Sequence, residues 1–368
     1  MSFQREYEKY NDFDMQNYLH NASENQIRTI LQKQSISEME FLSLLSSKAE
    51  PLLEEMARRA HKLTVYQFGK TIVLYTPMYL SNFCTNQCLY CGFSVKNKII
   101  RKQLSFEEVE KEAQEIARTG LKHILVLTGD AQNIATIEYL IECIEILKRY
   151  FTAINIEIYA LEKDGYARLI NAGVDALTIY QETYNRALYD RLHIAGPKKD
   201  FDFRLEAPER ACNAGIRAVN IGALLGLDNW QQEVFSTGLH ANYLQNRYPD
   251  VEVSISLPRM RPHVGEFNPQ YTVSDKNLVQ IMTAYRLFMP RVGIAISTRE
   301  EAEFRDRIIR LGVTKMSAGS TTAVGGHTQT EDKSSQFDIS DDRTVEQIVL
   351  SIKSLGYQPV FKDWSPVI

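Results

Sequence analysis

The stretch "TIVLYTPMYLSNFCTNQCLYCGF", residues 71–93, joins a strand-like run to a dense group of cysteines. Residues 71–81 are rich in β-branched and aromatic side chains, which is typical of a buried strand. Three of the chain's five cysteines, Cys84, Cys88 and Cys91, follow in the spacing CxxxCxxC. Barrels of parallel strands bind their ligands at the carboxyl ends of the strands, and these cysteines would lie at such an end.

Short β-rich runs alternate with amphipathic helical patterns over the rest of the chain. Eight runs predict strands, at 71–81, 123–129, 154–160, 174–181, 218–227, 251–258, 292–298 and 313–319. Helical patterns lie between most of them, at 105–120, 136–150, 164–173, 230–247 and 274–290. This alternation indicates a doubly wound sheet or a (β/α)8 TIM-type barrel, and the number of strands favours the barrel.

The two ends of the chain differ from this alternation. Residues 1–65 carry apolar side chains at three- and four-residue spacing, and Ser23 is placed to cap a helix. The tail predicts one helix and a short strand that pack on the barrel. We therefore expect an N-terminal helical extension over 1–65, the barrel over 66–322 and a short C-terminal extension over 323–368.

Composition and charge narrow the class of protein. The chain has 368 residues and a net charge of −4, so it has no electrostatic footprint for nucleic acid or an anionic membrane surface. The first residues are polar and charged, which argues against a signal peptide. No apolar run approaches the ~20 residues of a membrane helix. We expect a cytoplasmic protein, in which clustered cysteines bind metal or perform redox chemistry more often than they form disulfides.

Three thiols at this spacing favour one kind of metal site. A structural zinc site takes four protein ligands, whereas three thiolates form an incomplete cage for a four-iron cluster and leave one iron open. An open iron can bind a substrate or cosubstrate, so the pattern predicts catalysis. The alternatives are a zinc site or cysteines without a joint role. Cys143 and Cys212 lie in helical patterns, where packing in the core is the better interpretation.

"CTNQCLYCGF" resembles the radical S-adenosylmethionine signature CxxxCxφC, with Tyr90 as the aromatic residue. The resemblance implies a [4Fe-4S] cluster and S-adenosylmethionine as cofactors. "LTGD", which contains Thr128, Gly129 and Asp130, is similar to the segment that binds the methionine amino group in that superfamily. Here Asp130 stands where Glu is usual and Thr128 where Gly is common. An ordinary turn after a strand is the alternative interpretation of this segment.

Most of the chain from Thr71 onwards resembles the 2-iminoacetate synthase family, the tyrosine lyases of thiamine biosynthesis. The resemblance rests on a run of motifs in order, among them "CGFSVKNKIIRK", "IYQETY", "KKDFDFRLEAPERA", "IGALLGLDNW", "LPRMRP", "STREEAEFRDR", "MSAGSTT", "QFDISDDRTVEQIV" and "QPVFKDW". It implies that an adenosyl radical takes hydrogen from the amino group of L-tyrosine and that the Cα–Cβ bond breaks to give p-cresol and dehydroglycine. It also implies thiazole synthase as a partner and a reductant such as flavodoxin or ferredoxin.

Other activities stay open at this point. A tryptophan lyase is one, and a hydrogenase-maturation-type tyrosine lyase is another. Relatives of the second kind hold a further cluster on C-terminal cysteines, whereas this sequence has no cysteine after Cys212. Outside the enzymes, the chain could be a metal-bearing scaffold for thiazole synthase.

The remaining candidate residues lie near the ends of the fourth, seventh and eighth predicted strands, and in the segment that follows the fourth. By resemblance, Glu182 and Arg204 contact S-adenosylmethionine, and a salt bridge between the two is the alternative. Arg299, at the end of the seventh strand, is the predicted clamp for the tyrosine carboxylate, with Ser297 and Ser317 as hydroxyl groups beside it.

Three arginines follow the sixth and seventh predicted strands, and the role of each depends on whether its side chain faces the cavity. For Arg299, the competing interpretation is an ion pair with Glu300 or Glu303. Arg259 and Arg261 alternate at the end of the sixth strand, so we expect both to face the same side.

Overall fold

Eight parallel strands close into a barrel in this computed structural model, which describes residues 2–10, 12–329 and 335–362. The strands are β1 (Thr71–Ser81), β2 (His123–Thr128), β3 (Ala153–Glu157), β4 (Ala176–Glu182), β5 (Ala218–Ala223), β6 (Glu252–Ser256), β7 (Gly293–Ile296) and β8 (Lys315–Ser317). They pair in sequence order, and β1 pairs with both β2 and β8, which closes the ring. The predicted barrel is confirmed.

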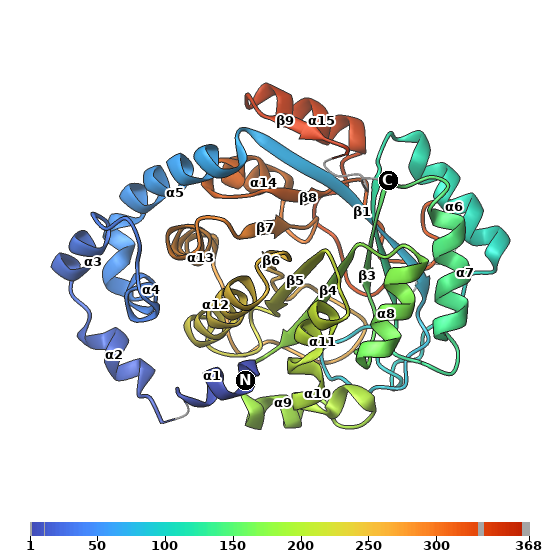
Figure 1. The fold of residues 1–368 in the computed structure, drawn as a ribbon, viewed down its shortest axis with the longest axis horizontal. Helices are drawn as coiled ribbons and strands as arrows, with labels where there is room; N and C mark the ends of the chain where they lie inside the picture. Colours follow the sequence, from blue (N-terminus) through green and yellow to red (C-terminus); the bar gives the residue numbers. More distant parts are fainter. Residues whose placement is uncertain (1, 11, 330–334, 363–368) are drawn as a thin grey trace.

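Helices cover the outside of the barrel between the strands (Figure 1). They are α6 (Phe106–Arg118), α7 (Ile137–Leu147), α8 (Lys163–Ala172), α9 (Arg186–Leu192), α10 (Phe201–Leu205), α11 (Ala207–Asn213), α12 (Trp230–Arg247), α13 (Asp275–Phe288) and α14 (Ala302–Ile308). The sequence pattern predicted five of them but not α9, α10, α11 and α14. These four helices have seven residues or fewer, too few to show a clear helical period.

The N-terminal helices lie on one flank of the barrel, beside α12 and α13 (Figure 1). They are α1 (Phe3–Glu8), α2 (Met15–Asn21), α3 (Glu24–Ile30), α4 (Glu38–Leu44) and α5 (Leu53–Phe68). Ser23 caps α3, as predicted, by accepting a hydrogen bond from the backbone of Gln26. A 3-10 turn containing Pro51 separates α4 from α5.

The C-terminal part returns to the start of β1. It contains α15 (Val345–Ser354) and β9 (Gln358–Val360), and β9 pairs in parallel with the first residues of β1, outside the ring. A buried ion pair between Arg305 of α14 and Asp341 ties this segment to the barrel. Parts of the expected extensions, at residues 1, 11 and 363–368, and residues 330–334 lie outside the described residues.

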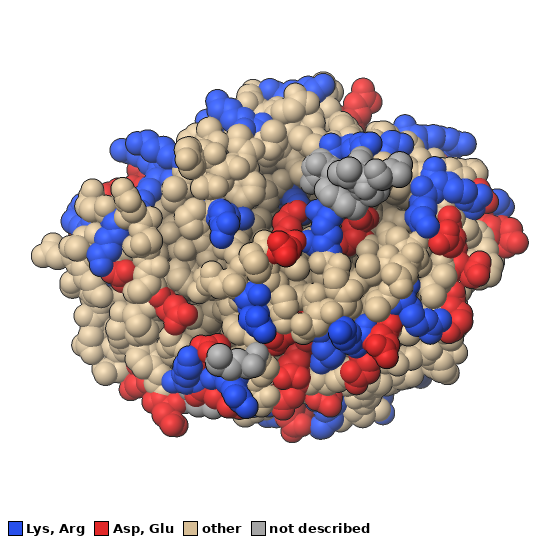
Figure 2. All heavy atoms as spheres, in the orientation of Figure 1, with Lys and Arg blue, Asp and Glu red and all other residues tan. Residues whose placement is uncertain are grey.

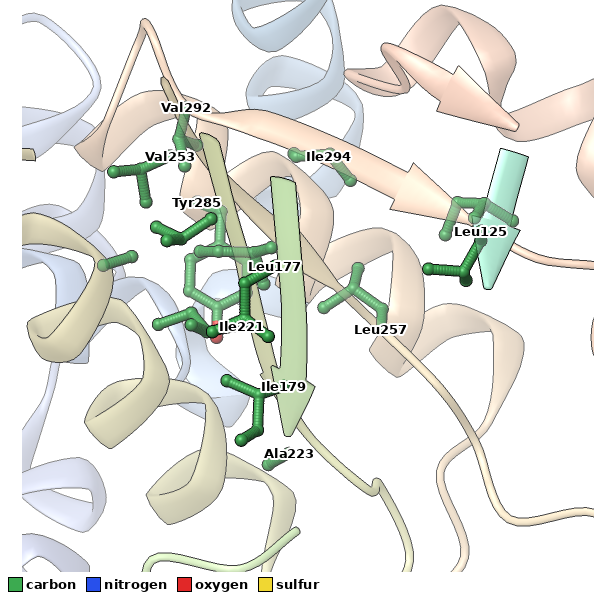
Figure 3. Close-up of a cluster of buried hydrophobic side chains, with 14 of the residues drawn as sticks. Leu125, Leu177, Ile179, Ile221, Ala223, Val253, Leu257, Tyr285, Val292 and Ile294 are labelled. Atoms are coloured by element: carbon green, nitrogen blue, oxygen red, sulfur yellow. The ribbon is translucent and has the colours of Figure 1, made fainter. Parts of the chain in front are cut away.

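Alternation along the strands separates two environments. One set of side chains packs outward against the helices, and Figure 3 shows Leu177, Ile179 and Ile221 of β4 and β5 beside Tyr285 of α13. The alternate set points into the barrel and is unusually polar, with Asn155 and Thr178 joined by a hydrogen bond of 3.0 Å. Barrels of this kind bind their ligands at the carboxyl ends of the strands, so we expect the site at that end.

The distribution of charge on the surface agrees with the sequence, which showed no basic area for nucleic acid. Acidic and basic side chains are interspersed on the face drawn in Figure 2, and they do not gather into one basic area. No helix in the described part of the chain is both long and apolar enough to cross a membrane.

Candidate active site

The cysteine loop, residues 82–102, leaves the end of β1 and crosses the carboxyl ends of neighbouring strands. On one side Thr85 donates two hydrogen bonds, from its backbone and its hydroxyl, to the carbonyl oxygen of Asp130 after β2, at 2.8 and 2.9 Å. On the other side the backbone of Leu89 donates to Leu192, in the segment after β4. The loop is thereby held at the end of the barrel that the sequence predicted.

The three thiols of this loop lie near one another. Burial raises the pKa of Cys88 to about 12 against the opposing charge of Lys198, and Cys91 and Cys84 raise it further. The pKa of Cys84 is also raised, mainly by burial and next by the neighbouring charge of Cys91. Within the described residues, no three His, Cys, Asp or Glu side chains are close enough to share a single ion. Three cysteine thiolates on one loop are the donor set that a four-iron cluster with one open iron takes, so the chemistry of these residues fits a cluster.

The turn after β2 packs directly against the start of the cysteine loop. A Cβ atom on Gly129 would lie 2.2 Å from the carbonyl oxygen of Phe83 and 3.1 Å from Cβ of Cys84, so only glycine allows this approach. Asp130 accepts a hydrogen bond of 2.8 Å from Asn86 through one carboxylate oxygen. Its other oxygen is buried and has no partner among the described residues, as is also true of the Thr128 hydroxyl. An orphaned carboxylate oxygen here fits the amino group of a bound ligand.

Tyr90 of the signature directs its hydroxyl away from the cavity. His193 has its Nδ1 2.8 Å from the carbonyl oxygen of Tyr189, so that nitrogen carries the proton. The hydroxyl of Tyr90 therefore donates to Nε2 of His193, at 2.7 Å. Burial, helped by the charge of Lys198, lowers the pKa of His193 to about 2 and keeps it neutral. The ring of Tyr90 remains free to line the cavity.

Glu182 ends β4 in a strained conformation. Its φ of 70° is the one positive value for a non-glycine residue among those the structure describes, and the pairing register with β5 shifts beside it. Strain of this kind is commonly stored at functional sites. The carboxylate lies 2.5 Å from Nζ of Lys198 and 3.6 Å from the guanidinium of Arg204. The ion pair expected as the alternative role for Glu182 and Arg204 is thus present, and Lys198 joins it.

Two cavities meet at this end of the barrel. The outer cavity, beside the cysteine loop, is lined by Tyr90, Cys91, Glu182, Lys198, Leu224, Met260, Arg261 and His263. The inner cavity, inside the barrel, is lined by Tyr75, Pro77, Tyr79, Leu125, Leu127, Ser256, Leu257, Ala295, Ser297, Thr298, Ser317, Ser320 and Thr322. Both cavities share Glu157, Tyr180, Pro258, Arg299, Gln336 and Phe337, which form the junction between them.

Arg299 is the cation at this junction. Its guanidinium carbon lies 3.4 Å from the ring centre of Phe337, and no carboxylate within the described residues pairs with it. Burial lowers the pKa of Arg299, whereas Tyr79, Tyr180 and Glu157 act to raise it. The predicted alternative, a pair with Glu300 or Glu303, is wrong because Glu300 pairs with Arg259 and Glu303 pairs with Arg307. The guanidinium of Arg299 also donates a hydrogen bond of 3.4 Å to the carbonyl oxygen of Arg259, and a cavity-lining cation without a carboxylate partner is a ready site for a ligand carboxylate.

The other predicted residues divide between the cavities and their walls. Ser297 and Ser317 line the inner cavity, and the Ser317 hydroxyl accepts a hydrogen bond of 3.0 Å from the backbone of Thr298. Arg261 lines the outer cavity, whereas Arg259 is held by Glu300 in the wall. The expectation that both arginines face the same side stays a prediction; Arg259 pairs with Glu300, and Arg261 lies 3.6 Å from Glu301.

Glu157 is a site residue that the sequence analysis missed. It sits at the junction, at the end of β3, and burial raises its pKa to about 7. Glu182 raises this pKa further, and Arg299 lowers it. The available signal was an acid at the alternate, inward-facing positions of the strand run "INIEIYA", two residues after Asn155. Cys143 and Cys212 are buried in helices, as expected, and take no part in the site.

Comparisons with known proteins place this site in a class. Residues 78–236 match the radical SAM superfamily, and residues 256–358 match the Biotin and Thiamin Synthesis associated domain. The chain is a radical S-adenosylmethionine enzyme, and its cofactors are a [4Fe-4S] cluster and S-adenosylmethionine.

Its nearer relatives define the family. The chain is 38% identical over 339 residues to the 2-iminoacetate synthase of Escherichia coli (strain K12), covering 92% of this chain and 90% of that protein. It belongs to the 2-iminoacetate synthase family, which are carbon–carbon lyases. The crystal structure of HydG, a maturase of the [FeFe]-hydrogenase, superposes with a TM-score of 0.90 at 32% identity, covering 96% of this chain and 80% of that one. Methylornithine synthase (PylB) shares the fold, with a TM-score of 0.73 at 20% identity.

Proposed function

We propose that this protein cleaves the Cα–Cβ bond of L-tyrosine to give 2-iminoacetate and p-cresol. The observation that carries the proposal is the junction between the two cavities. There the unpaired guanidinium of Arg299 stands between the space beside the cysteines and a pocket walled by Tyr75, Tyr79 and Tyr180. An amino acid with an aromatic side chain matches that arrangement.

The cofactors have matching residues around the outer cavity. Cys84, Cys88 and Cys91 would hold the cluster, and the ring of Tyr90 would cover it. The free oxygen of Asp130, in the turn of Thr128 and Gly129, suits the methionine amino group, and Glu182, Lys198 and Arg204 supply charges for its polar ends. When bound, these cofactors supply a 5′-deoxyadenosyl radical, which takes one hydrogen atom from the substrate and becomes 5′-deoxyadenosine.

Arg299 would bind the substrate carboxylate through two parallel hydrogen bonds. This placement puts the amino group at the junction, facing the outer cavity, and the phenol in the inner one. Ser297 and Ser317 stand beside the carboxylate as hydroxyl partners.

Glu157 at the junction is suited to take a proton from the ammonium group, because its pKa of about 7 leaves it able to accept one near neutral pH. Loss of a hydrogen atom from the neutral amine then allows the Cα–Cβ bond to break. The aromatic fragment gains one electron and one proton to become p-cresol, and the remainder is 2-iminoacetate.

The same assignment places the chain in its cellular setting. The product would supply the thiazole moiety of thiamine through a complex with thiazole synthase, in the cytoplasm. A reductant such as flavodoxin or ferredoxin would deliver electrons to the cluster. We assign the catalytic function to the barrel over 66–322, with 1–65 and 323–368 as extensions.

A hydrogenase-type tyrosine lyase is the second candidate, and the similarity to HydG in fold favours it. One observation ranks it second: the identity of 38% to 2-iminoacetate synthase, over 92% of this chain.

An anaerobic turnover assay tests the proposal. The reconstituted protein receives dithionite, S-adenosylmethionine and either tyrosine or tryptophan. We expect p-cresol, glyoxylate from hydrolysis of 2-iminoacetate, and 5′-deoxyadenosine with tyrosine only. Carbon monoxide or cyanide among the products would favour the second candidate. An indole product from tryptophan, or 5′-deoxyadenosine without p-cresol, would show that the substrate assignment is wrong.

A further inference from the structure

The cysteine loop differs from the rest of the chain in its charge. Residues 82–102 contain Lys96, Lys98, Arg101 and Lys102 and no Asp or Glu, although the whole chain carries a net charge of −4. Arg101 and Lys102 are used internally: Arg101 donates to backbone carbonyls of the loop, and Lys102 pairs with Glu108. Lys96 and Lys98 are exposed, and within the described residues neither is paired with a carboxylate. The loop therefore presents two uncompensated positive charges to solvent.

The same area exposes apolar side chains. Leu89 is 47% exposed, Val95 47%, Ile194 48% and Val264 48%. Exposed apolar side chains are informative when they gather in one area, because such patches mark interaction sites. These four side chains belong to three loops at the carboxyl end of the barrel. We refer to Leu89, Val95, Lys96, Lys98, Ile194 and Val264 together as the loop face.

Hydrogen bonds between the three loops make the loop face one continuous surface. The backbone of Ile194 donates to Gln87, two residues from Leu89. Asn97, between the two lysines, donates to the carbonyl oxygen of Val264 at 2.7 Å. The backbone of Val95 donates to Asn86 within the cysteine loop. Apolar and basic side chains thus lie side by side on backbone that is mutually fixed.

The loop face also lies close to the metal ligands. Leu89 lies between Cys88 and Cys91 in the sequence, and Val95 follows Cys91 by four residues. The side chains of Cys84 and Cys91 are only partly buried. The charges of Cys84 and Cys91 act on Arg101 from within the same loop. A protein that covers the loop face therefore lies over the loop that carries the three cysteines.

We propose that the loop face is the docking site of an acidic electron-transfer protein that reduces the cluster, an inference that rests on the proposed function. One electron passes from the reduced carrier to the oxidised cluster, so the carrier is oxidised by one electron and the cluster is reduced by one. Small apolar patches rimmed by charge of one sign suit brief encounters of this kind, in which opposite charge steers association. The complementary partner carries carboxylates around its own redox centre.

The test compares two electron donors on the reconstituted holoenzyme. Lys96→Glu/Lys98→Glu reverses the charge of the loop face, and Lys62→Glu/Lys70→Glu makes the same change in net charge at exposed positions on α5 and before the start of β1, at the opposite end of the barrel. Formation of 5′-deoxyadenosine is measured with reduced flavodoxin and with dithionite. We expect the KM for flavodoxin to rise at least about tenfold in the loop-face variant only, with dithionite rates within about twofold of the wild type. Rising salt, from about 50 to about 300 mM, should slow the flavodoxin reaction of the wild-type protein.

Three outcomes would overturn the docking site: equal flavodoxin kinetics in both variants, an equal loss with dithionite, or a wild-type reaction insensitive to salt. If the loop-face variant loses binding of thiazole synthase and keeps its flavodoxin kinetics, the surface belongs to that partner and the proposal is also wrong. Failure of the proposed function has a different signature, namely 5′-deoxyadenosine without p-cresol in every variant. The donor comparison does not depend on p-cresol.

Discussion

Gly129→Ala would disturb the cluster without altering any of its ligands. The added Cβ would lie 2.2 Å from the carbonyl oxygen of Phe83, whereas ordinary contact begins at 3.4 Å. The start of the cysteine loop must therefore retreat by about 1 Å, because β2 is fixed in the barrel by pairing on both sides. Cys84 is the next residue after Phe83, so its sulfur moves as well. A displacement of about 1 Å at a catalytic site can cost about 100-fold in rate.

Iron content and the charge-transfer absorbance of the cluster measure this effect after anaerobic reconstitution. We expect the wild-type protein to take up roughly four irons per chain and the variant to fall well below that. Gly165→Ala is the matched control, because its new Cβ would meet only side-chain atoms of Ile137 and Leu161 at 3.3 Å or more, inside a helix. A Gly129→Ala protein with full iron content and wild-type turnover would refute the argument that this glycine fixes the loop.

Three further perturbations test the site and its surroundings. Arg299→Lys replaces a forked donor by a point charge, so the KM for tyrosine should rise about tenfold or more in steady-state kinetics, and an unchanged KM would remove Arg299 from substrate binding. Tyr90→Phe leaves Nε2 of buried His193 without its donor, which should lower the free energy of unfolding in urea by about 1–3 kcal/mol, and no loss would contradict the assigned tautomer. Burial raises the pKa of Glu233 from 4.5 to about 8, so the folded protein keeps a proton that the unfolded chain releases above pH 4.5. The free energy of unfolding should therefore fall by about 1 kcal/mol per pH unit between these values, and Glu233→Gln should remove that slope; parallel pH profiles would refute it.

The sequence was sufficient for the barrel because its signal is repeated. Each strand shows a short β-branched run, and the predicted bounds of the helix at Trp230–Arg247 match those observed. The placement of the cysteines at the end of β1 followed from the barrel itself. Arg299 was found because it follows the seventh strand at the carboxyl end of the barrel, where ligands bind.

Residues brought together by tertiary structure could not be predicted in the same way. Lys198 reaches Glu182 only because a turn after β4 folds back over the outer cavity. Gln336 lies 245 positions after Cys91, yet its amide reaches that sulfur at 3.8 Å, and its oxygen accepts from Tyr79. The tautomer of His193 depends on a helix, α9, that was too short to show a period. Periodicity describes local structure and carries no information on such contacts.

The position from which hydrogen is removed tests the central claim most directly. The reconstituted protein is allowed to turn over tyrosine in D2O, where the amino hydrogens exchange and those bound to carbon do not. In the proposed binding mode, Arg299 and Glu157, which line the junction of the two cavities, place the amino group so that it faces the outer cavity. The account predicts p-cresol together with 5′-deoxyadenosine that carries one deuterium. Unlabelled 5′-deoxyadenosine, or the absence of p-cresol, would contradict it.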